Sequence, residues 1–570
     1  MIDSMVKTVL RNITIGDILE TINKKYGNKT ALRIKNDDGS FRQISYVKLG
    51  RRAVSISSVL INLGIKKGDR VAILSENRPE WATAYFGIIS CGGTILPIDV
   101  KLTDAEIRFI LNDSQAKCIF LSGKYINIID RLRGDLAHLK DIILLDKSPR
   151  PDIIQLSKLR PHRGKERARP IYPEDTAIIV YTSGTTGSAK GVEITYKSLL
   201  FQALRFSEII RCTPKEKLLS VLPLNHMLEI TGGLIAPLYA GSCVTYCDTL
   251  KTNTLLPLMR ETGITAIISV PLVLKLLYSG IMKKSAKLHP LKQKIFRALL
   301  FLSTFLLKFK IRAGRFLFPS VHKEFGWHLH TFISGGAPLN PDIEIGLNAL
   351  GFRILQGYGL TETAPVISVN TYSDNKFGSV GKPMPGVEVM ILKEKSLDVE
   401  GEILTRGPHV MKGYFRNPEK TAEVLKNGWF HTGDLGYIDK DGFLYISGRK
   451  KNLIILGGGK KVFPEEVEEV IGRSPYIKEI CVMAKVAERG LRTGHEEVYA
   501  VIVPNLELFA QDNITAKKSI KDKLSFEIAR LTKDLAPYKR IMSFDISYES
   551  LPKTVTAKIK RDAVSKMAIS

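Results

Sequence analysis

Cysteine is scarce in this 570-residue sequence, and no two cysteines form a CxxC pair. The six that occur are Cys91, Cys118, Cys212, Cys243, Cys247 and Cys481. Sparse cysteines in apolar runs indicate buried free thiols and a reducing compartment, not a disulfide framework. The pair four residues apart, Cys243 and Cys247, has no further His or Cys nearby to complete a metal site, so we favour core packing for it.

Long hydrophobic runs are also lacking. The longest uncharged stretch in the middle of the chain, 230–247, contains Gly232, Gly233, Pro237 and Gly241, which would interrupt a spanning helix, so we expect it in a core. The opening residues, MIDSMVKTVLRNITIGDILETI, show no apolar h-region and no small-residue cleavage site. A signal peptide is therefore not predicted, and we expect a cytoplasmic protein.

Acidic residues are outnumbered, with 57 Asp and Glu against 84 Lys and Arg, a net charge of +27. Such an excess points to polyanionic partners: nucleotides, nucleic acid or an anionic membrane. Zinc-finger spacing, a homeodomain signature and aromatic RNA-binding motifs are all missing, so no nucleic-acid partner is expected.

The chain is longer than a single domain usually is, and the pattern of predicted helices and strands changes along it. Helical and strand-like runs alternate over 52–120, and again over 176–250 and 264–360, which predicts a mostly parallel α/β sheet. Short strands around turn residues at 387–408 predict a small β subdomain. From Gly448 onward, basic strands, the helix FPEEVEEVIGRS, further strands and a helix at 527–534 predict a compact α+β domain.

The predicted architecture is thus α/β: a large N-terminal domain of mixed and parallel sheets with helices and a small β subdomain, followed by a small, mobile α+β C-terminal domain. We place the domains at 1–448 and 449–570.

The strongest chemical signal is IIVYTSGTTGSAKGVEIT at 178–195, where a buried strand enters a loop rich in Ser, Thr and Gly. Gly184 and Gly187 let the backbone N–H groups face phosphate oxygens, and Lys190 adds positive charge. Hydroxyl donors come from Thr182, Ser183, Thr185 and Thr186. The spacing is not that of a Walker loop, which needs four residues between its glycines and Ser or Thr after the lysine.

YTSGTTGSAKGV resembles the phosphate-binding signature of adenylate-forming enzymes, which include acyl-CoA synthetases, peptide-synthetase adenylation domains and luciferases. Six further motifs follow in that family's order. They are LPLNHMLE (222–229), SGGAPL (334–339), QGYGLTET (356–363), GWFHTGDLG (428–436), GRKKNLIILGGGKKVFPEEVE (448–468) and PKTVTAKIKRD (552–562). The resemblance covers nearly the whole chain and, on its long-chain features, is closest to long-chain fatty acyl-CoA synthetases.

The resemblance implies an adenine and phosphate site in the larger domain. Its residues would be Gly335, Gly336, Ala337 and Pro338, with Gln356, Gly357, Tyr358, Gly359 and Thr361. A ring such as that of Tyr358 can stack on adenine. Glu362, with Thr185, would hold Mg²⁺, which takes one or two carboxylates plus substrate phosphates; the alternative for Glu362 is a solvated loop residue.

For the ribose, the resemblance implies Asp434 as the ligand of the hydroxyls and Arg449 as a ribose or phosphate contact. A structural salt bridge is the alternative for Arg449. Lys558 would bridge carboxylate and α-phosphate in adenylation, where catalysis depends on positioning and cations. Ala557 precedes it where the family usually has Gly.

Alternation between two half-reactions is also implied, with Lys451 as hinge and Gly457, Gly458 and Gly459 as the loop on the coenzyme A side. Asn452 stands where many relatives have Asp. His226 would position the carboxylate or exclude water, with a satisfied core histidine as the alternative.

These features predict an ATP- and Mg²⁺-dependent ligase that forms acyl-AMP and passes the acyl group to coenzyme A. Glu229, three residues after His226, is similar to long-chain enzymes, whereas Ile230 stands where some thermophilic ones place an aromatic gate. The alternatives are acyl carrier protein as acceptor, another carboxylic acid as substrate, a catalytically inactive lipid or nucleotide sensor, and a nucleic-acid binder that leaves the ordered motifs unexplained.

Residues 298–307, ALLFLSTFLL, are apolar and have basic flanks. The flanking cations are Lys292, Lys294, Arg297, Lys308, Lys310, Arg312 and Arg315. Ten residues are too few to span a bilayer. We expect peripheral contact with an anionic membrane, at the inner face of the cell membrane; a core helix with solvated ends is the alternative.

Overall fold

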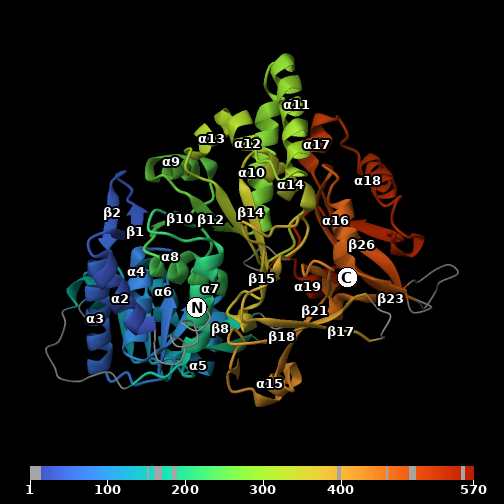
Figure 1. Ribbon diagram of the computed structural model, residues 1–570. Coiled ribbons are helices and arrows are strands. Elements are labelled where there is room, and N and C mark those ends of the chain that lie inside the picture. The colour runs from blue at the N-terminus through green and yellow to red at the C-terminus, as the bar shows by residue number, and fades with distance from the viewer. Residues whose placement is uncertain are drawn as a thin grey trace. The chain divides into compact units, whose positions relative to one another are not determined.

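The computed structural model describes residues 15–150, 153–159, 170–182, 189–394, 399–456, 460–486, 496–553 and 559–569 (Figure 1). Its residues cluster into two compact units. The first comprises Met1–Val389 and Thr405–Phe430, and the second Met390–Leu404 and His431–Ser570. The domain boundary predicted at 448/449 falls inside the second unit and stays a prediction about which segment moves.

One sheet of the first unit has nine strands among the described residues. In spatial order they are β16 (Lys382–Pro383), β15 (Ser368–Val369), β14 (Arg353–Tyr358), β13 (Thr331–Ser334), β12 (Ala266–Ser269), β10 (Lys217–Ser220), β11 (Cys243–Tyr246), β1 (Thr30–Lys35) and β2 (Phe41–Ser45). The run from β14 to β1 is parallel, and antiparallel pairs lie at both edges. Parallel strands buried on both faces are expected to be apolar, as these are.

The other sheet of this unit has eight strands in the part of the chain described. They are β19 (Gly413–Tyr414), β9 (Lys190–Thr195), β8 (Thr176–Thr182), β4 (Thr94–Ile98), β3 (Arg70–Leu74), β5 (Cys118–Leu121), β6 (Asp141–Leu144) and β7 (Ile154–Gln155). Strands β8 to β7 run parallel, whereas β9 is antiparallel to both β8 and β19.

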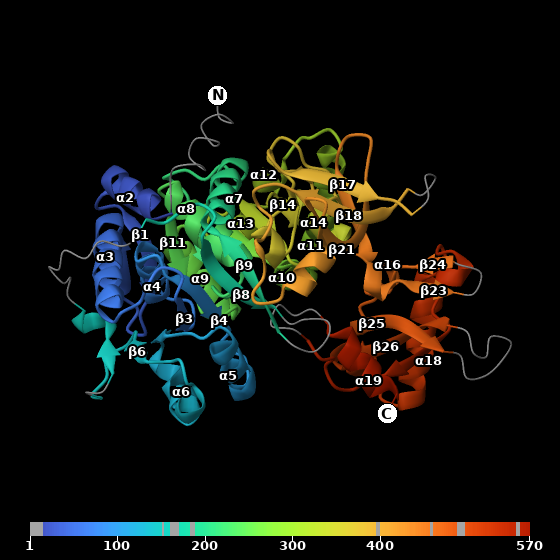
Figure 2. The same cartoon turned by 90° about the horizontal axis from the view of Figure 1, so that it is seen from below.

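Successive side chains of a strand point to opposite faces of the sheet, and the core that each side enters shows which helices cover that face. On β3, Val71 and Ile73 enter the core between the sheets, whereas Ala72 and Leu74 enter the outer core. The inner layer contains α2 (Ile15–Tyr26), α3 (Tyr46–Asn62), α4 (Pro79–Ser90), α7 (Tyr196–Ile209) and α8 (Ala236–Tyr239). Figure 2 shows α4 between β1 and β3, as this alternation requires.

Outer helices cover the remaining faces of the two sheets. The eight-stranded sheet is covered by α5 (Asp104–Asp113) and α6 (Ile126–Leu132). Near the nine-stranded sheet lie α9 (Thr252–Thr262), α10 (Pro271–Ala286), α11 (Pro290–Leu307), α12 (Gly314–Leu317), α13 (Pro319–Phe325) and α14 (Pro341–Ala349). A short helix, α15 (Pro418–Val424), follows β19.

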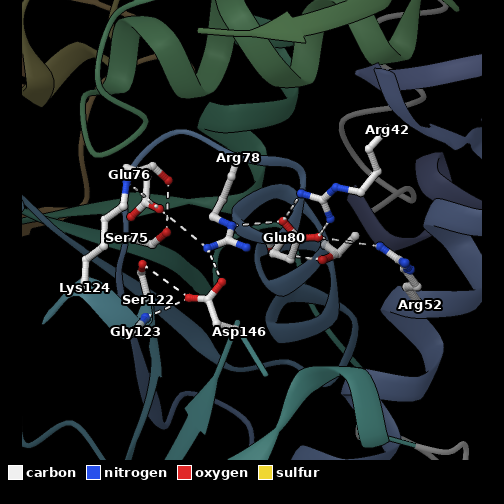
Figure 3. A network of polar contacts seen from close by, with 11 residues as sticks. Arg42, Arg52, Ser75, Glu76, Arg78, Glu80, Ser122, Gly123, Lys124 and Asp146 are labelled. Atoms are coloured by element: carbon white, nitrogen blue, oxygen red, sulfur yellow. Dashed lines mark hydrogen bonds and ion pairs between the residues drawn. The ribbon is translucent and has the colours of Figure 1, made fainter. Parts of the chain in front are cut away.

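A network of charges at the start of α4 joins several elements of this unit (Figure 3). Glu80 is buried and pairs with Arg42, Arg52 and Arg78. Arg78 also contacts Asp146 at 2.8 Å. Although burial acts to raise the pKa of Glu80, the hydrogen bond and charge of Arg42 and the charge of Arg78 hold it below its usual range, so this buried carboxylate stays ionised.

The predicted small β subdomain is confirmed, as a sheet that has five strands among the residues described. Its order is β17 (Glu388–Leu392), β18 (Gly401–Arg406), β21 (Trp429–Ile438) and β20 (Leu425–Lys426), with β22 (Leu444–Arg449) also paired to β21.

The remainder of the second unit is α+β, as predicted. A hairpin of β23 (Ile454–Leu456) and β24 (Lys460–Val462) precedes a sheet of β25 (Ile477–Val486), β26 (Glu496–Pro504) and β27 (Ser543–Ile546). The helices are α16 (Pro464–Ile471), α17 (Leu506–Gln511), α18 (Lys517–Leu531) and α19 (Arg561–Ile569). Helices α16 to α18 pack on one face of the sheet, and α19 packs on the other.

The structure also corrects and supports smaller expectations. The helix predicted at 527–534 begins ten residues earlier, at Lys517, and ends at Leu531. All six cysteines are free, and Cys243 and Cys247 are buried, as expected for core packing. The stretch 230–247 lies largely in the core. Within the described residues, no helix is both long and apolar enough to cross a membrane.

Candidate active site

The predicted phosphate loop is held at its base by a β-hairpin of the first unit. Strands β8 and β9 are antiparallel, and their register places Thr182 opposite Lys190. These two predicted residues are therefore neighbours across the strand pair, at the point where the loop leaves the sheet. The loop residues Ser183, Gly184, Thr185, Thr186 and Gly187 lie outside the described part of the chain.

Tyr414 connects this hairpin to Glu362. The ammonium of Lys190 lies 5.4 Å from the centroid of the Tyr414 ring. The Tyr414 hydroxyl donates to Glu362 Oε1 at 3.0 Å. Strand β19, which carries Tyr414, pairs with β9, so the sheet fixes this side chain beside the phosphate-loop base. Two predicted residues far apart in sequence, Lys190 and Glu362, are thus brought to one place.

The backbone around Glu362 is held on several sides. Glu362 lies in a 3₁₀ turn, Thr361–Thr363, and its carbonyl accepts from Met411 N at 2.8 Å. The buried Gln202 of α7 donates to the carbonyls of Thr363 and Val366. A carboxylate presented by a braced turn is suited to hold a cation or a polar ligand at a fixed position.

The predicted adenine segments follow two adjacent parallel strands. Strand β13 leads into Gly335, Gly336, Ala337 and Pro338, and β14 ends in Gln356, Gly357 and Tyr358. The register pairs Ser334 with Gln356. In parallel sheets, ligands bind beyond the carboxyl ends of the strands, and these segments occupy that position. Tyr358 is half-buried, and Gln356 is buried with its Oε1 unpaired among the described residues.

Close backbone packing explains a glycine in the second of these segments. A Cβ at Gly359 would lie 1.8 Å from the carbonyl oxygen of Pro365, so any side chain would push the turn apart. At Gly336 the φ angle is +84°, a conformation that favours glycine. Gly359 keeps the chain tight between β14 and the Glu362 turn, whereas Gly336 lies in the segment after β13.

His226 lies after β10, beside the end of β4. Its Nε2 is 3.9 Å from Asp99 Oδ2, and Asn225 Nδ2 donates to the same oxygen at 3.2 Å. Asp99 is buried, and its other oxygen accepts from Lys101 N. The carboxylate of Asp99 therefore fixes the chain around His226.

In the second unit, the structure brings the two predicted ribose residues together. Asp434 on β21 is directly opposite Arg449 on β22, and Arg449 Nε lies 2.6 Å from Asp434 Oδ1. Asp434 is buried, and its N–H donates to Thr432 Oγ1 at 3.0 Å. The carboxylate of Asp434 is thus held by the salt bridge that is the alternative role for Arg449, and the ribose role of both residues stays a prediction.

Lys451 follows directly in a 3₁₀ turn, Lys450–Asn452. Burial lowers its pKa, and the charge of Asp562 opposes that shift. Asn452 donates to Glu465 Oε1 at 2.8 Å. Glu465 also pairs with Arg561, which donates to Glu468 as well. The predicted hinge residue therefore lies next to a half-buried ionic cluster.

Lys558 lies outside the described residues, but both flanks of its segment are anchored. Lys553 pairs with Ile559 in an isolated bridge, and Lys560 N donates to Pro552 O at 2.8 Å. Gly457, Gly458 and Gly459 also lie outside the described part, between the paired strands β23 and β24.

The side chains near Glu362 fit a metal ion only when a bound nucleotide supplies further oxygen ligands. Among the described residues, no group of three or more His, Cys, Asp or Glu side chains could hold a metal ion. Glu362 offers one carboxylate, which is what Mg²⁺ uses when phosphates and water supply the rest. The side chains present therefore fit Mg²⁺ bound with a nucleotide.

A model of the AMP-binding enzyme family matches residues 19–415. The chain belongs to the AMP-binding enzyme family. The match covers the phosphate-loop hairpin, the adenine segments, Glu362 and Tyr414. The predicted fold class and the predicted resemblance to adenylate-forming enzymes are both confirmed.

Relatives of this AMP-binding enzyme include ligases of more than one acid. The chain is 30% identical over 466 residues to the long-chain-fatty-acid–CoA ligase FadD15 of Mycobacterium bovis, covering 78% of this chain and 76% of the relative. It is 28% identical over 549 residues to the indoleacetate–CoA ligase of Aromatoleum aromaticum, covering 95% of each. This AMP-binding enzyme is thus an adenylate-forming acyl-CoA ligase.

Among solved structures, ATP-bound MatB from Rhodopseudomonas palustris is 25% identical, with a TM-score of 0.76. The alignment covers 97% of this chain and 98% of that one. ATP and coenzyme A are the substrates of such ligases.

Sequence reasoning missed three residues of this AMP-binding enzyme. Tyr414 was not singled out because its partner Glu362 is 52 positions away. Asp99 directly follows the apolar strand β4, and an acidic residue at that position could have been recognised in the sequence. Arg561 lies inside the PKTVTAKIKRD motif but was passed over for Lys558.

Proposed function

We propose that this ligase activates a long-chain fatty acid with ATP and transfers the acyl group to coenzyme A, releasing AMP and pyrophosphate. The observation that carries the ATP-dependent step is the junction of Lys190, Tyr414 and Glu362 beside the phosphate-loop hairpin, and the similarity to the long-chain-fatty-acid–CoA ligase FadD15 supports the acid and the acceptor. The junction supplies a cation and an anchored carboxylate where a nucleoside triphosphate needs both.

In the first half-reaction, a carboxylate oxygen of the acid attacks the α-phosphorus, and the bond to the bridging oxygen of pyrophosphate breaks. Charge builds on phosphate oxygens during this displacement, so fixed cations stabilise the transition state. We assign that role to Lys190 and Lys558, with backbone N–H groups and hydroxyls of the loop from Thr182 to Gly187. Mg²⁺ would be held by Glu362 and Thr185 and would neutralise phosphate charge.

Binding of the nucleotide itself is assigned to the two remaining residue sets. Tyr358 and the segment from Gly335 to Pro338 would contact adenine, and Asp434 with Arg449 would contact ribose. The hydrogen bond from Asp434 N to Thr432 Oγ1 fixes the backbone of Asp434 for this role. His226, whose Nε2 lies 3.9 Å from Asp99 Oδ2, would position the carboxylate of the acid.

In the second half-reaction, the thiol of coenzyme A attacks the acyl carbonyl, and AMP leaves as the carbonyl–phosphate bond breaks. We propose that Lys451 acts as the hinge of the segment from 449 to 570, which withdraws Lys558 and presents Gly457, Gly458 and Gly459. A hinge needs only a few residues to absorb the rotation.

The acid and the acceptor are tested in one experiment. Thioester and AMP formation are measured for acids from acetate to oleate and for aromatic acids including indoleacetate, with coenzyme A and acyl carrier protein as acceptors. We expect the highest kcat/KM for long-chain acids with coenzyme A. A preference for aromatic or short acids would contradict the long-chain assignment.

Two outcomes of the same panel would favour the alternatives. The net charge of +27 suits an acidic carrier protein, and faster transfer to carrier protein would make that the acceptor. Failure to form either acyl-AMP or thioester from any acid would indicate a sensor of lipid or nucleotide.

We also propose a cytoplasmic location with peripheral contact to the inner face of the cell membrane. Free, mostly buried thiols suit a reducing compartment. The basic flanks of the 298–307 segment suit an anionic surface.

A further inference from the structure

Helix α11 has two apolar sides, and only one of them is packed. Phe296, Leu299 and Leu300 lie against the core that covers the nine-stranded sheet. Ser303 is buried and donates to the carbonyl of Ala349 at 2.6 Å. This side accounts for the core-helix alternative, because it fixes α11 to α14.

The other side of α11 forms a regular exposed stripe. Its members recur every three or four residues, the spacing of one helix face: Leu291, Ile295, Ala298, Leu302, Phe305 and, just past the helix, Phe309. Leu291 and Phe309 are each 62% exposed. Phe301, next to the stripe, is 76% exposed. Single exposed apolar residues are common on protein surfaces, but a continuous stripe of them marks an interaction site.

Helices next to α11 add further exposed apolar side chains. Figure 1 shows α10, α11 and α12 beside one another in the first unit, and α11 contacts both α10 and α12. Phe316 in α12 is 85% exposed, and Leu276 in α10 is 59% exposed. The unpartnered surface thus extends beyond the ten-residue run that the sequence singled out.

Charge around this surface has one sign. No Asp or Glu occurs between Glu261 and Glu324. The exposed cations of this stretch that have no ion pair among the described residues are Lys275, Lys283, Lys287, Lys292, Lys294, Arg297, Lys308, Lys310 and Lys323. A second copy of the chain would bring the same charges together and be repelled, whereas an anionic bilayer complements both the charge and the apolar stripe.

Two of the predicted flanking cations serve the fold instead. Arg312 donates to Asn348 Oδ1 at 3.0 Å, and burial lowers its pKa to about 10. Arg315 donates to the carbonyl of Trp327. These arginines therefore do not belong to the lipid-facing set, and replacing them would disturb packing.

We propose that the exposed side of α11, with the lysines around it, docks this enzyme on an anionic lipid bilayer. The helix lies in the interface plane, its phenylalanines enter the boundary between headgroups and acyl chains, and the lysines contact headgroup phosphates. This inference rests on the proposed peripheral location but not on the identity of the acid.

Vesicle flotation tests the surface without any substrate. The full chain is mixed with phosphatidylcholine vesicles with or without phosphatidylglycerol, at low and at high salt. We expect binding only to the anionic vesicles, and less of it at high salt. Replacing Lys292, Lys294, Lys308 and Lys310 with Gln should reduce binding at least about tenfold.

The matched control removes the same charge elsewhere. It replaces Lys48, Lys215, Lys440 and Lys518, four exposed lysines outside this surface, with Gln. The control should bind as the parent does. Equal losses in both variants would mean that net charge alone drives binding, and this would overturn the docking surface.

An apolar variant separates lipid from protein as the occupant. Phe301→Ser with Phe305→Ser should weaken vesicle binding while thioester formation on a short acid is retained. Light scattering on the parent should give a monomer. If the parent is a dimer that this variant dissociates, and vesicle binding is unchanged, the stripe is a subunit interface and the proposal is wrong.

Discussion

At the scale of single residues, the contact between Tyr414 and Glu362 leads to a prediction about magnesium. Glu362→Ala should reduce pyrophosphate release by about 10²-fold, as expected when one electrostatic stabiliser of the phosphates is lost. Tyr414→Phe keeps the ring beside Lys190 but removes the hydrogen bond to the carboxylate. It should therefore cost about tenfold, chiefly as a higher Mg²⁺ requirement.

Pyrophosphate release over a Mg²⁺ titration measures both variants. Tyr172→Phe is the control, because the Tyr172 ring is exposed and its cation contact is with Lys67, not with Lys190 or Glu362. Unchanged kinetics of Glu362→Ala at limiting Mg²⁺ would rule out the assignment of this carboxylate.

Glu229 gives a second residue-scale prediction, which concerns pH. Its side chain is fully buried, with no hydrogen bond to either oxygen among the described residues. Burial raises its pKa from an ordinary 4.5 to about 8, although the nearby Ser220 hydroxyl opposes the shift. The unfolded chain releases this proton near pH 4.5 and the folded chain near 8, so folding takes up a proton between these values. The contribution to stability therefore falls as pH rises through that window.

Glu229→Gln removes the titration and keeps the shape. Melting temperature measured from pH 5 to pH 8 should fall less in this variant than in the parent, since each pH unit is worth up to about 1.4 kcal/mol. Glu419→Gln, at an exposed position, should behave as the parent. Parallel pH profiles for the parent and Glu229→Gln would disprove a neutral buried acid.

Individual site residues were predictable where a motif named them, and not where a long-range contact made them. Lys190 and Glu362 could be proposed from their loops. Tyr414 could not, because its role arises from the pairing of β19 with β9. The salt bridge of Arg449 with Asp434 likewise depends on strand register, which the sequence does not specify residue by residue.

At the scale of elements, the π-helix Glu229–Ile235 links the His226 motif to the core. A Cβ at Gly233 would lie 2.4 Å from the carboxyl carbon of Glu229, so a side chain at position 233 would clash with the Glu229 carboxyl group. Gly233→Ala should destabilise the protein by about 1–3 kcal/mol through overpacking.

Gly280 in α10 is the matched control for this substitution. A Cβ there meets nothing within 4 Å, so Gly280→Ala should stabilise by about 0.5–1 kcal/mol through helix propensity. Urea denaturation of both variants measures the difference. Equal effects at the two glycines would show that Glu229 does not pack on Gly233.

Periodicity predicted many elements because it reports burial. Strands β3 and β4 and helix α4 lie within 52–120, where the sequence predicted alternating helical and strand-like runs. Helix α18 was predicted too short because it begins with the exposed polar residues Lys517, Lys518 and Ser519, although Ile520 and Leu524 after them are buried and mark its core-facing side. For α11, apolar residues on two sides of the helix left both a core helix and a surface helix possible from sequence. The packing on α14 shows which side is buried.

At the scale of the whole molecule, the chain passes between its two compact units three times, at 389/390, 404/405 and 430/431. The second unit therefore includes segments before and after the predicted hinge at Lys451. A domain boundary inferred from sequence marks where the pattern of predicted helices and strands changes. The division into compact units depends instead on long-range strand pairing, such as that of β18 with β21. Which segment moves is a question for kinetics.

The division of labour between half-reactions is the prediction that tests such movement. Lys558→Ala should nearly abolish acyl-AMP formation, followed as pyrophosphate release, because the cation that bridges carboxylate and α-phosphate is lost. The same variant should still form thioester from supplied acyl-AMP and coenzyme A, since Lys558 leaves the site before that step. Lys566→Ala, at an exposed position in α19 of the same unit, should retain both activities. Equal loss of both half-reactions in Lys558→Ala would show that one arrangement of the second unit serves both steps, and the alternation around Lys451 would be wrong.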